Sequence, residues 1–332
     1  MSERWSKEKI MELGGSFLLS RNLISAAELD LFSQLERAPR TVSDLCISEG
    51  WDARGLRILM DALVANELLS LSGNGQYGVP QSLVGLLSKD SSESVLPMIL
   101  HRARMWNSWS HLTDIVRTGR NPNPMIIAAR SDDDMESFIG AMEVVGRMMA
   151  GKMVESVDLT RFTNLLDVGG GPGTYSIAFL KRAPHMRATL FDLPEVVNMA
   201  RMRFADEALL DRVTLVAGDY TTDELPPGHD LALLSAVIHS NSREGNRKLF
   251  ERVYRSLGAG GIVLIRDFVL DETRTSPPDG AVFAVNMLVA TRAGNCYTFE
   301  EIREDLEHAG FGDISMIRKG KKMDQLVTAR KN

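Results

Sequence analysis

The segment Leu165-Leu-Asp-Val-Gly-Gly-Gly-Pro-Gly173 decides the fold of this chain. Its first four residues form a short, mostly apolar run that is typical of a buried strand. The glycines that follow allow a sharp turn and a close approach of the backbone to a ligand. A helical pattern begins at Thr174, so the loop joins a strand to a helix. This context favours a ligand-binding turn, and a simple tight connection is the alternative.

Strands and helices alternate on the C-terminal side of this loop. Further strands are predicted at Ala188–Asp192, Val213–Val216, Asp230–Ser235 and Gly261–Asp267, with helices at Thr174–Arg182, Glu195–Phe204 and Arg243–Leu257. The alternation predicts a doubly wound α/β sheet that is mostly parallel. A last helix, Thr298–Ala309, precedes two runs at 313–318 and 325–329, which predict an antiparallel hairpin at the sheet edge.

The N-terminal part has a different pattern. Thr41 and Asp52 are placed to cap two helices, and the second helix carries leucine and methionine along one face. Two short extended runs around Gly73-Asn-Gly-Gln76 then predict a hairpin. Helix, turn, helix and hairpin together make a winged-helix pattern. We therefore expect two domains, residues 1–155 and 156–332.

The composition is that of an ordinary globular protein. Of 332 residues, 44% are hydrophobic and 25% are charged, which excludes a disordered or collagen-like chain. The net charge of -6 disfavours nucleic acid as a partner. The sequence shows neither a signal peptide nor an apolar run of about 18 residues, and Cys46 and Cys296 form no disulfide framework. We expect a cytoplasmic protein without a membrane partner.

The spacing of the glycines narrows the choice of ligand. A dinucleotide fingerprint needs glycines at i, i+2 and i+5, whereas Thr174 or Ser176 stands at the last position here. No Gly-Lys-Ser/Thr follows, so the loop is not a Walker phosphate loop. The pattern is an acid followed by alternate glycines: Asp167, Gly169, Gly171 and Gly173. A carboxylate at this strand end suits a ligand amino group and would repel a phosphate.

Two more acids end the next two strands. Asp192 follows Gly169 by 23 residues, where a carboxylate can accept hydrogen bonds from ribose hydroxyls. Asp219 is followed by Tyr220, which suits an adenine amine and a stacked base. Each acid alone is more often a cap or turn residue. Because parallel strands end at one edge of a sheet, three such acids predict an adenosine site there.

One histidine and one aspartate follow the last two strands. His239 is expected to end the fourth strand and Asp267 the fifth, so adjacent parallel strands bring both side chains to the same edge of the sheet. A carboxylate can hold the imidazole tautomer, and the imidazole can then act as a general base. A structural histidine beside an ordinary strand-end aspartate is the alternative.

Methionine is frequent, with 17 residues. Met135, Met142 and Met149 share one helical face with Phe138. This stripe is either ordinary core or an adaptable apolar wall for a flat ligand.

These motifs resemble the class I S-adenosylmethionine-dependent methyltransferases. Over almost its full length the chain resembles the two-domain small-molecule O-methyltransferases, which include caffeate, bacterial polyketide and acetylserotonin enzymes. The resemblance rests on Leu166–Gly173, Phe191–Pro194, Ala217–Asp219 and Gly55–Leu63. It implies a Rossmann-like sheet behind an all-α, winged-helix dimerisation domain, and a homodimer. It also implies S-adenosyl-L-methionine as cofactor and S-adenosyl-L-homocysteine as product.

The resemblance also implies roles for single residues. His239 is the expected general base, oriented by Asp267. The expected cofactor-binding residues are Asp167, Gly169, Gly171, Gly173, Asp192, Leu193, Asp219, Tyr220 and Ser235. The expected acceptor-binding residues are Trp106, Phe138, Met142, Asn286 and Met287. No metal is expected, and the acceptor is expected to be a hydroxyl of an aromatic or polycyclic small molecule.

The sequence departs from the family pattern at two places. The usual His-Asp-Trp is His239-Ser240-Asn241 here, and Cys296 or Asn295 stands where a second carboxylate often braces the base. The acceptor atom therefore stays open, with a C-methyltransferase or a cofactor-dependent hydroxylase as the alternative. A winged-helix regulator with a degenerate second domain is the third hypothesis. Its candidate recognition helix, residues 52–66, is largely apolar on one face, which disfavours DNA binding.

Overall fold

The computed structural model describes residues 5–121 and 132–332, which form two compact units divided after Trp106. The division lies earlier than the boundary predicted after residue 155. Residues 107–121 and 132–155 belong to the C-terminal unit, where helix α9 (Asp132–Glu155) packs on α10 (Thr174–Arg182). Within the two described ranges, no helix is long and apolar enough to cross a membrane.

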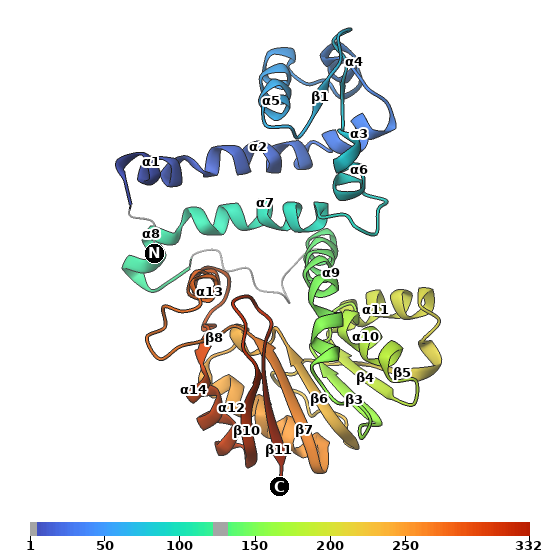
Figure 1. Cartoon of the computed structure of the whole chain (residues 1–332), viewed down its shortest axis with the longest axis vertical. Helices are drawn as coiled ribbons and strands as arrows, with labels where there is room; N and C mark the ends of the chain where they lie inside the picture. Colours follow the sequence, from blue (N-terminus) through green and yellow to red (C-terminus); the bar gives the residue numbers. More distant parts are fainter. Residues whose placement is uncertain (1–4, 122–131) are drawn as a thin grey trace. The chain divides into compact units, whose positions relative to one another are not determined.

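The N-terminal unit is mainly helical and carries one short hairpin (Figure 1). Its elements are α1 (Lys7–Gly15), α2 (Phe17–Glu28), α3 (Leu31–Arg37), α4 (Val42–Glu49), α5 (Ala53–Ala65), β1 (Ser70–Leu71), β2 (Tyr77–Gly78), α6 (Gln81–Leu87) and α7 (Leu96–Ser110), which runs past the boundary. Thr41 caps α4 in a capping box, and Asp52 caps α5. Strands β1 and β2 pair antiparallel. The predicted caps and winged-helix pattern are confirmed.

The C-terminal unit alternates strands and helices as predicted. Beyond α9 and α10 its elements are α8 (Leu112–Thr118), β3 (Asn164–Val168), β4 (Arg187–Asp192), α11 (Pro194–Asp206), η2 (Leu210–Arg212), β5 (Val213–Ala217), β6 (His229–Ser235), η3 (Ile238–Ser240), α12 (Arg243–Ser256), β7 (Leu257–Asp267), β8 (Val269–Leu270), α13 (Pro278–Ala290), β9 (Tyr297–Thr298), α14 (Phe299–His308), β10 (Phe311–Arg318) and β11 (Gln325–Lys331).

Seven strands form one mixed sheet in the order β10-β11-β7-β6-β3-β4-β5. Five neighbouring strands are parallel, whereas β11 runs antiparallel to both β7 and β10, which confirms the predicted edge hairpin. After β3, the strands β4 and β5 are added on one side of β3. The next strand, β6, pairs with the other side of β3. The carboxyl ends of β3 and β6 therefore flank the switch point, where open α/β sheets bind ligands.

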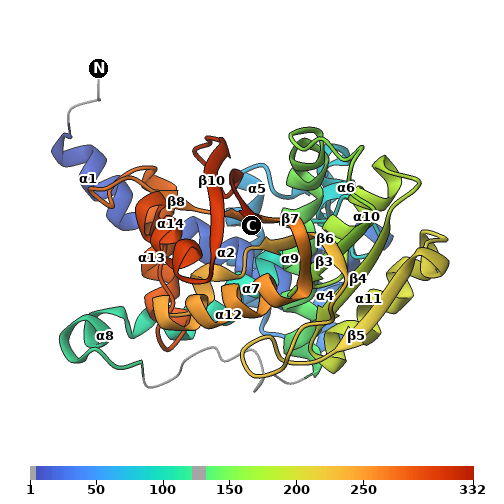
Figure 2. The same ribbon diagram turned by 90° about the horizontal axis from the view of Figure 1, so that it is seen from below.

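Helices cover both faces of this sheet (Figure 2). Side chains alternate between the faces along each strand. Leu165 of β3 packs with residues of α9, α10 and α11, whereas the next residue, Leu166, packs with residues of α12 and α14. Two apolar layers thus hold the sheet rigid, so its carboxyl edge offers fixed positions for functional side chains.

Candidate active site

The glycine loop joins β3 to α10 in a conformation that side chains rarely adopt. Gly169, Gly171 and Gly173 all have positive φ angles, of 66°, 57° and 80°. At Gly173 a Cβ atom would also lie 2.5 Å from Cε2 of Phe204. A Cβ at Gly171 would meet open space. Glycine is therefore required for shape at Gly173, and the loop leaves room in front of Gly171.

Asp167 is buried at the end of β3, with 1% of its surface exposed. The Ser176 hydroxyl donates to its Oδ2 at 2.7 Å. Burial raises the pKa of this carboxyl to about 7; the hydrogen bond from Ser176 opposes this rise, and the charge of Asp192 contributes to it. A buried carboxyl of this kind is stabilised in its charged form by a cationic ligand.

Asp192 ends β4 and holds the glycine loop from the other side. The backbone N–H of Gly171 donates to its Oδ2 at 2.7 Å, and that of Leu193 donates to its Oδ1 at 2.8 Å. Burial raises the pKa of Asp192 to about 6 in spite of these two bonds. The structure therefore brings together Asp192, Leu193 and the glycine loop.

Asp219 and Tyr220 follow β5 and reach the same region. The Asp219 carboxylate closes a turn, because the backbone N–H and the hydroxyl of Thr221 donate to its Oδ1 at 2.8 and 2.7 Å. The Tyr220 ring lies against the loop: a Cβ at Gly169 would be 3.6 Å from Tyr220 Cε1. Burial, together with the charges of Asp192 and Asp219, raises the Tyr220 pKa. Tyr220 therefore remains a neutral hydroxyl in the physiological range.

Ser235 ends β6, and a buried arginine lies beside it. Arg266 of β7 is 2% exposed, and its Nη1 donates to the Ser235 hydroxyl at 3.2 Å. Its guanidinium carbon lies 5.1 Å from the centre of the Tyr175 ring. Sequence reasoning missed Arg266, although an arginine inside an apolar strand beside the predicted Asp267 was the available signal.

His239 and Asp267 form a buried pair. His239 Nδ1 lies 2.8 Å from Oδ1 and 3.0 Å from Oδ2 of Asp267, and the two residues are 7% and 1% exposed. His239 lies in η3, beyond the end of β6, whereas Asp267 is the last residue of β7. Because a carboxylate only accepts hydrogen bonds, the neutral imidazole carries its proton on Nδ1 and has a lone pair on Nε2.

Neighbouring residues hold the turn that carries His239. Asn246 of α12 donates from Nδ2 to the Ile238 carbonyl at 2.9 Å, and the backbone N–H of Asn295 donates to the His239 carbonyl at 2.9 Å. The Asn241 side chain donates to Asn246 Oδ1 at 3.1 Å. The departure at Asn241 thus has a structural use, because this side chain braces the turn.

Phe283 and Cys296 lie close to the pair of His239 and Asp267. Sequence reasoning singled out Cys296 but not Phe283. Phe283 of α13 was missed, and its ring meets His239 edge-on with centroids 4.9 Å apart. The only feature of the sequence that pointed to Phe283 was its position one helical turn before Met287. Cys296 is fully buried, and burial followed by the charge of Asp267 raises its thiol pKa to about 12. Cys296 is therefore a protonated thiol and does not replace a carboxylate.

The predicted acceptor residues lie in different surroundings. Asn286 Oδ1 accepts from Trp109 Nε1 at 3.1 Å, and Met287 is buried. Phe138 packs against the small core of Met135, Ile139 and Val196, while Met142 is half-buried. Trp106 belongs to the N-terminal unit, where its ring centroid lies 6.4 Å from that of Phe17.

The methionine stripe serves largely as core. Met149 and Met153 are residues of α9 that pack into the apolar layer between this helix and the sheet. Met135, also of α9, packs against α11. Among the described residues, no group of three or more His, Cys, Asp or Glu side chains is arranged to hold a metal ion.

Comparison with known proteins identifies the family. The family model of the O-methyltransferase domain matches residues 109–312, and that of the O-methyltransferase dimerisation domain matches residues 11–80. The chain therefore belongs to the S-adenosylmethionine-dependent O-methyltransferases that carry this dimerisation domain, and it is an enzyme of that class.

Individual relatives align over nearly the whole chain. The tetracenomycin polyketide synthesis 8-O-methyl transferase TcmO of Streptomyces glaucescens is 31% identical, over 92% of this chain and 91% of its own length. Acetylserotonin O-methyltransferase of Bos taurus is 30% identical, over 97% of both chains. The structure of human N-acetylserotonin methyltransferase in complex with SAM superposes with a TM-score of 0.85 at 28% identity, covering 100% of this chain and 99% of the other.

Proposed function

We propose that this enzyme transfers a methyl group to a hydroxyl of an aromatic or polycyclic small molecule, with His239 as general base and Asp267 as the residue that orients it. The observation that carries the proposal is the buried contact of His239 Nδ1 with both carboxylate oxygens of Asp267, at 2.8 and 3.0 Å. This contact directs Nε2 away from the aspartate, where it is available to take a proton.

The residues at the sheet edge fit S-adenosylmethionine. Asp167, a buried carboxyl whose pKa is raised to about 7, suits the cofactor's ammonium group. Asp192 suits the ribose hydroxyls, and Asp219 with the neutral Tyr220 ring suits the adenine. The positive φ angles of the loop and the open space before Gly171 leave room for such a ligand. Leu193 and Ser235 complete the proposed cofactor-binding set.

The chain's own contribution to the reaction is positioning and proton removal. When bound, S-adenosylmethionine supplies a methyl group on a sulfonium, which needs no further activation. His239 Nε2 accepts the proton of the acceptor hydroxyl, whose pKa is near 10 if it is a phenol. Asp267 stabilises the resulting imidazolium, and their burial excludes water from the proton transfer. No metal is needed for this step.

The acceptor is proposed to be flat and apolar. Phe283, which meets His239 edge-on, gives an aromatic surface beside the base. Phe138, Met142, Asn286 and Met287 of the C-terminal unit are proposed as further acceptor contacts, and the role expected of Trp106 stays a prediction. The names of relatives support this class, since they include a polyketide 8-O-methyl transferase and a 3-hydroxy-5-methyl-1-naphthoate 3-O-methyltransferase of Streptomyces sahachiroi.

We propose further that the chain forms a homodimer through its dimerisation domain. Helices α1 and α2 expose an apolar series in which Met11 is 76%, Leu13 60% and Leu18 60% exposed. Covering such a surface is a common reason for association. Sedimentation velocity should show a dimer, and Leu18→Glu should weaken it, whereas Met202→Glu on α11 should not. The cytoplasmic location stays a prediction.

The experiment that tests the catalytic proposal uses methyl-labelled cofactor and a panel of phenols and hydroxynaphthalenes. His239→Gln should lower kcat by about 10²–10⁴, the range of general-base catalysis, while calorimetry shows unchanged affinity for S-adenosylhomocysteine. His308→Gln on α14 is the matched control. A His239→Gln enzyme with nearly full kcat would remove the base assignment. Product mass and methylation position separate O-methylation from C-methylation and hydroxylation.

A further inference from the structure

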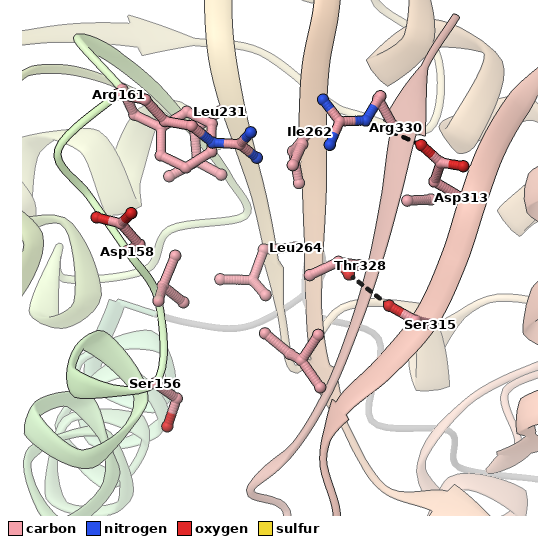
Figure 3. A pocket seen from close by; sticks show the side chains of 14 residues that line it. Ser156, Asp158, Arg161, Leu231, Ile262, Leu264, Asp313, Ser315, Thr328 and Arg330 are labelled. Atoms are coloured by element: carbon pink, nitrogen blue, oxygen red, sulfur yellow. Dashed lines mark hydrogen bonds and ion pairs between the residues drawn. The ribbon is translucent and has the colours of Figure 1, made fainter.

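A cavity of about 450 Å³ lies in the C-terminal unit, away from the proposed active site (Figure 3). It is bounded by the segment 156–162, which leads from α9 to β3, and by strands β6, β7, β10 and β11. Its volume falls within the range of small-molecule pockets, about 300–1,000 Å³. Nothing in the proposed reaction uses this cavity.

Strand geometry separates the cavity from the catalytic pair. Ile262 and Leu264 of β7 line it, whereas Asp267 is an odd number of residues further on and so faces the opposite side of the sheet. Leu231 lies near the start of β6, about 13 Å along the strand from Ser235 at its carboxyl end. The cavity and the catalytic residues are therefore on different faces and toward different ends.

The floor of the cavity is apolar. Val157 and Ile262 are half-buried and Ile317 is 44% exposed, whereas Leu231 and Leu264 lie fully buried beneath them and Phe162 forms one wall. Such a floor favours the hydrocarbon part of a ligand over bulk water.

The rim of the cavity is charged and directed inward. In Figure 3 the guanidinium groups of Arg161 and Arg330 point toward one another across Ile262. Arg161 stacks on Phe162, with 4.7 Å from its guanidinium carbon to the ring centre. Arg330 Nε donates to Asp313 Oδ2 at 3.1 Å, and Asp313 lies on the far side of Arg330 (Figure 3).

The second carboxylate on the rim does not lie between the two arginines. Asp158 accepts from the hydroxyl and the backbone N–H of Thr160, at 2.8 and 3.1 Å. These bonds, more than the charge of Arg161, hold its pKa below the ordinary value. Asp158 therefore stays ionised and engaged in its own turn. Two guanidinium groups that face one another above an apolar floor are complementary to one anion.

We infer that this cavity binds a small anionic molecule with an apolar body, namely an aromatic or aliphatic carboxylate. The carboxylate lies between Arg161 and Arg330, and the hydrocarbon part covers Ile262, Val157 and Ile317. Arginine suits this role because its planar fork donates two parallel hydrogen bonds to one carboxylate. The apolar floor disfavours a bare phosphate or sulfate, which would leave that floor uncovered. This site is independent of the proposed methyl transfer.

The test uses 2-naphthoate as probe, with 2-naphthylmethanol as its neutral analogue, in isothermal titration calorimetry. The protein is saturated with S-adenosylhomocysteine and carries His239→Gln, so that the acceptor region is altered. Naphthoate should bind this protein, and the alcohol should bind at least tenfold more weakly. Arg161→Gln with Arg330→Gln should weaken naphthoate at least tenfold. Arg201→Gln, an exposed arginine on α11, should change nothing.

Three results would overturn the inference. One is equal binding of the acid and the alcohol, which would show that charge plays no part. Another is a double arginine variant that binds naphthoate as tightly as the parent protein. The third is absence of naphthoate binding; if the double arginine variant then also changes its oligomeric state in sedimentation velocity, the face is covered by a second copy of the chain.

Discussion

Replacing Asp167 by asparagine should make the ligand-free enzyme more stable above neutral pH while it weakens cofactor binding. The substitution Asp167→Asn preserves the shape of the side chain and keeps an oxygen that can accept from the Ser176 hydroxyl, which lies 2.7 Å from Asp167 Oδ2 in the native enzyme. What the variant removes is a negative charge that is buried at the end of β3. The prediction therefore isolates the cost of burying that charge.

The magnitude follows from the raised pKa. An acid with a pKa of 3.8 in the unfolded chain and about 7 in the folded one binds more protons when folded between these values. Stability consequently falls as pH rises through this window, and the penalty is complete above about pH 7. At about 1.4 kcal/mol per tenfold change in acidity, it reaches about 4 kcal/mol at pH 8 and about 2 kcal/mol at pH 5.5.

Urea unfolding, monitored by hydrogen exchange of peptides from β3, measures the free energy of unfolding at pH 8 and at pH 5.5. Asp167→Asn should gain about 2 kcal/mol more over wild type at pH 8 than at pH 5.5. Asp206→Asn, at an exposed position on α11, is the control and should show no such pH dependence. Calorimetry with S-adenosylhomocysteine at pH 8 should show that Asp167→Asn binds at least about tenfold more weakly, because the ammonium loses its charged partner.

A stability difference between Asp167→Asn and wild type that is the same at both pH values would refute the reasoning. It would mean that Asp167 is not destabilised by burial in the folded enzyme. Retention of full affinity for S-adenosylhomocysteine would instead refute the assignment of Asp167 to the ammonium group, and it would leave the burial argument intact.

Three further predictions concern single positions. Gly173→Ala should destabilise the enzyme by about 2–5 kcal/mol in urea unfolding, since it adds a clash with the Phe204 ring of α11 to an unfavourable φ. The control is Gly119→Ala, at φ 68° but facing open space, which should destabilise the enzyme by only about 1 kcal/mol. Asn246→Ala should lower kcat by about tenfold or more with unchanged S-adenosylhomocysteine affinity, because it frees the turn that carries the proposed base; unchanged kcat would contradict this. Cys296 should stay unmodified by a disulfide reagent at pH 8, since its thiol is buried with a pKa of about 12, so Cys46→Ser should abolish the reactivity of the native protein.

Local signals were sufficient for much of the fold. Each parallel strand is an apolar run that stands between helical segments, and the loop after β3 needs glycine because three of its residues have positive φ. Thr41 and Asp52 cap their helices through bonds that span only three residues. Such contacts join residues that are close in sequence, so a local sequence pattern is sufficient to predict them.

Other features depend on residues that are distant in sequence. Helix α9 has the periodicity of any amphipathic helix, and only its packing on α10 assigns it to the C-terminal unit. Phe283 meets His239 across 44 positions of sequence, which no local pattern indicates. The buried Arg266 and the facing pair of Arg161 and Arg330 likewise depend on which strands become neighbours.

The sequence by itself determined the succession of elements, the glycine loop and the residue types at the strand ends. It also identified the histidine and aspartate of the catalytic proposal, because the carboxyl ends of parallel strands always share an edge. Only the tertiary structure decided that His239 Nδ1 lies within 3.0 Å of both Asp267 oxygens, and that Asp167 is buried deeply enough for its pKa to reach about 7. Distance and burial are set by packing between remote segments, and solvation energies follow from that packing rather than from residue type.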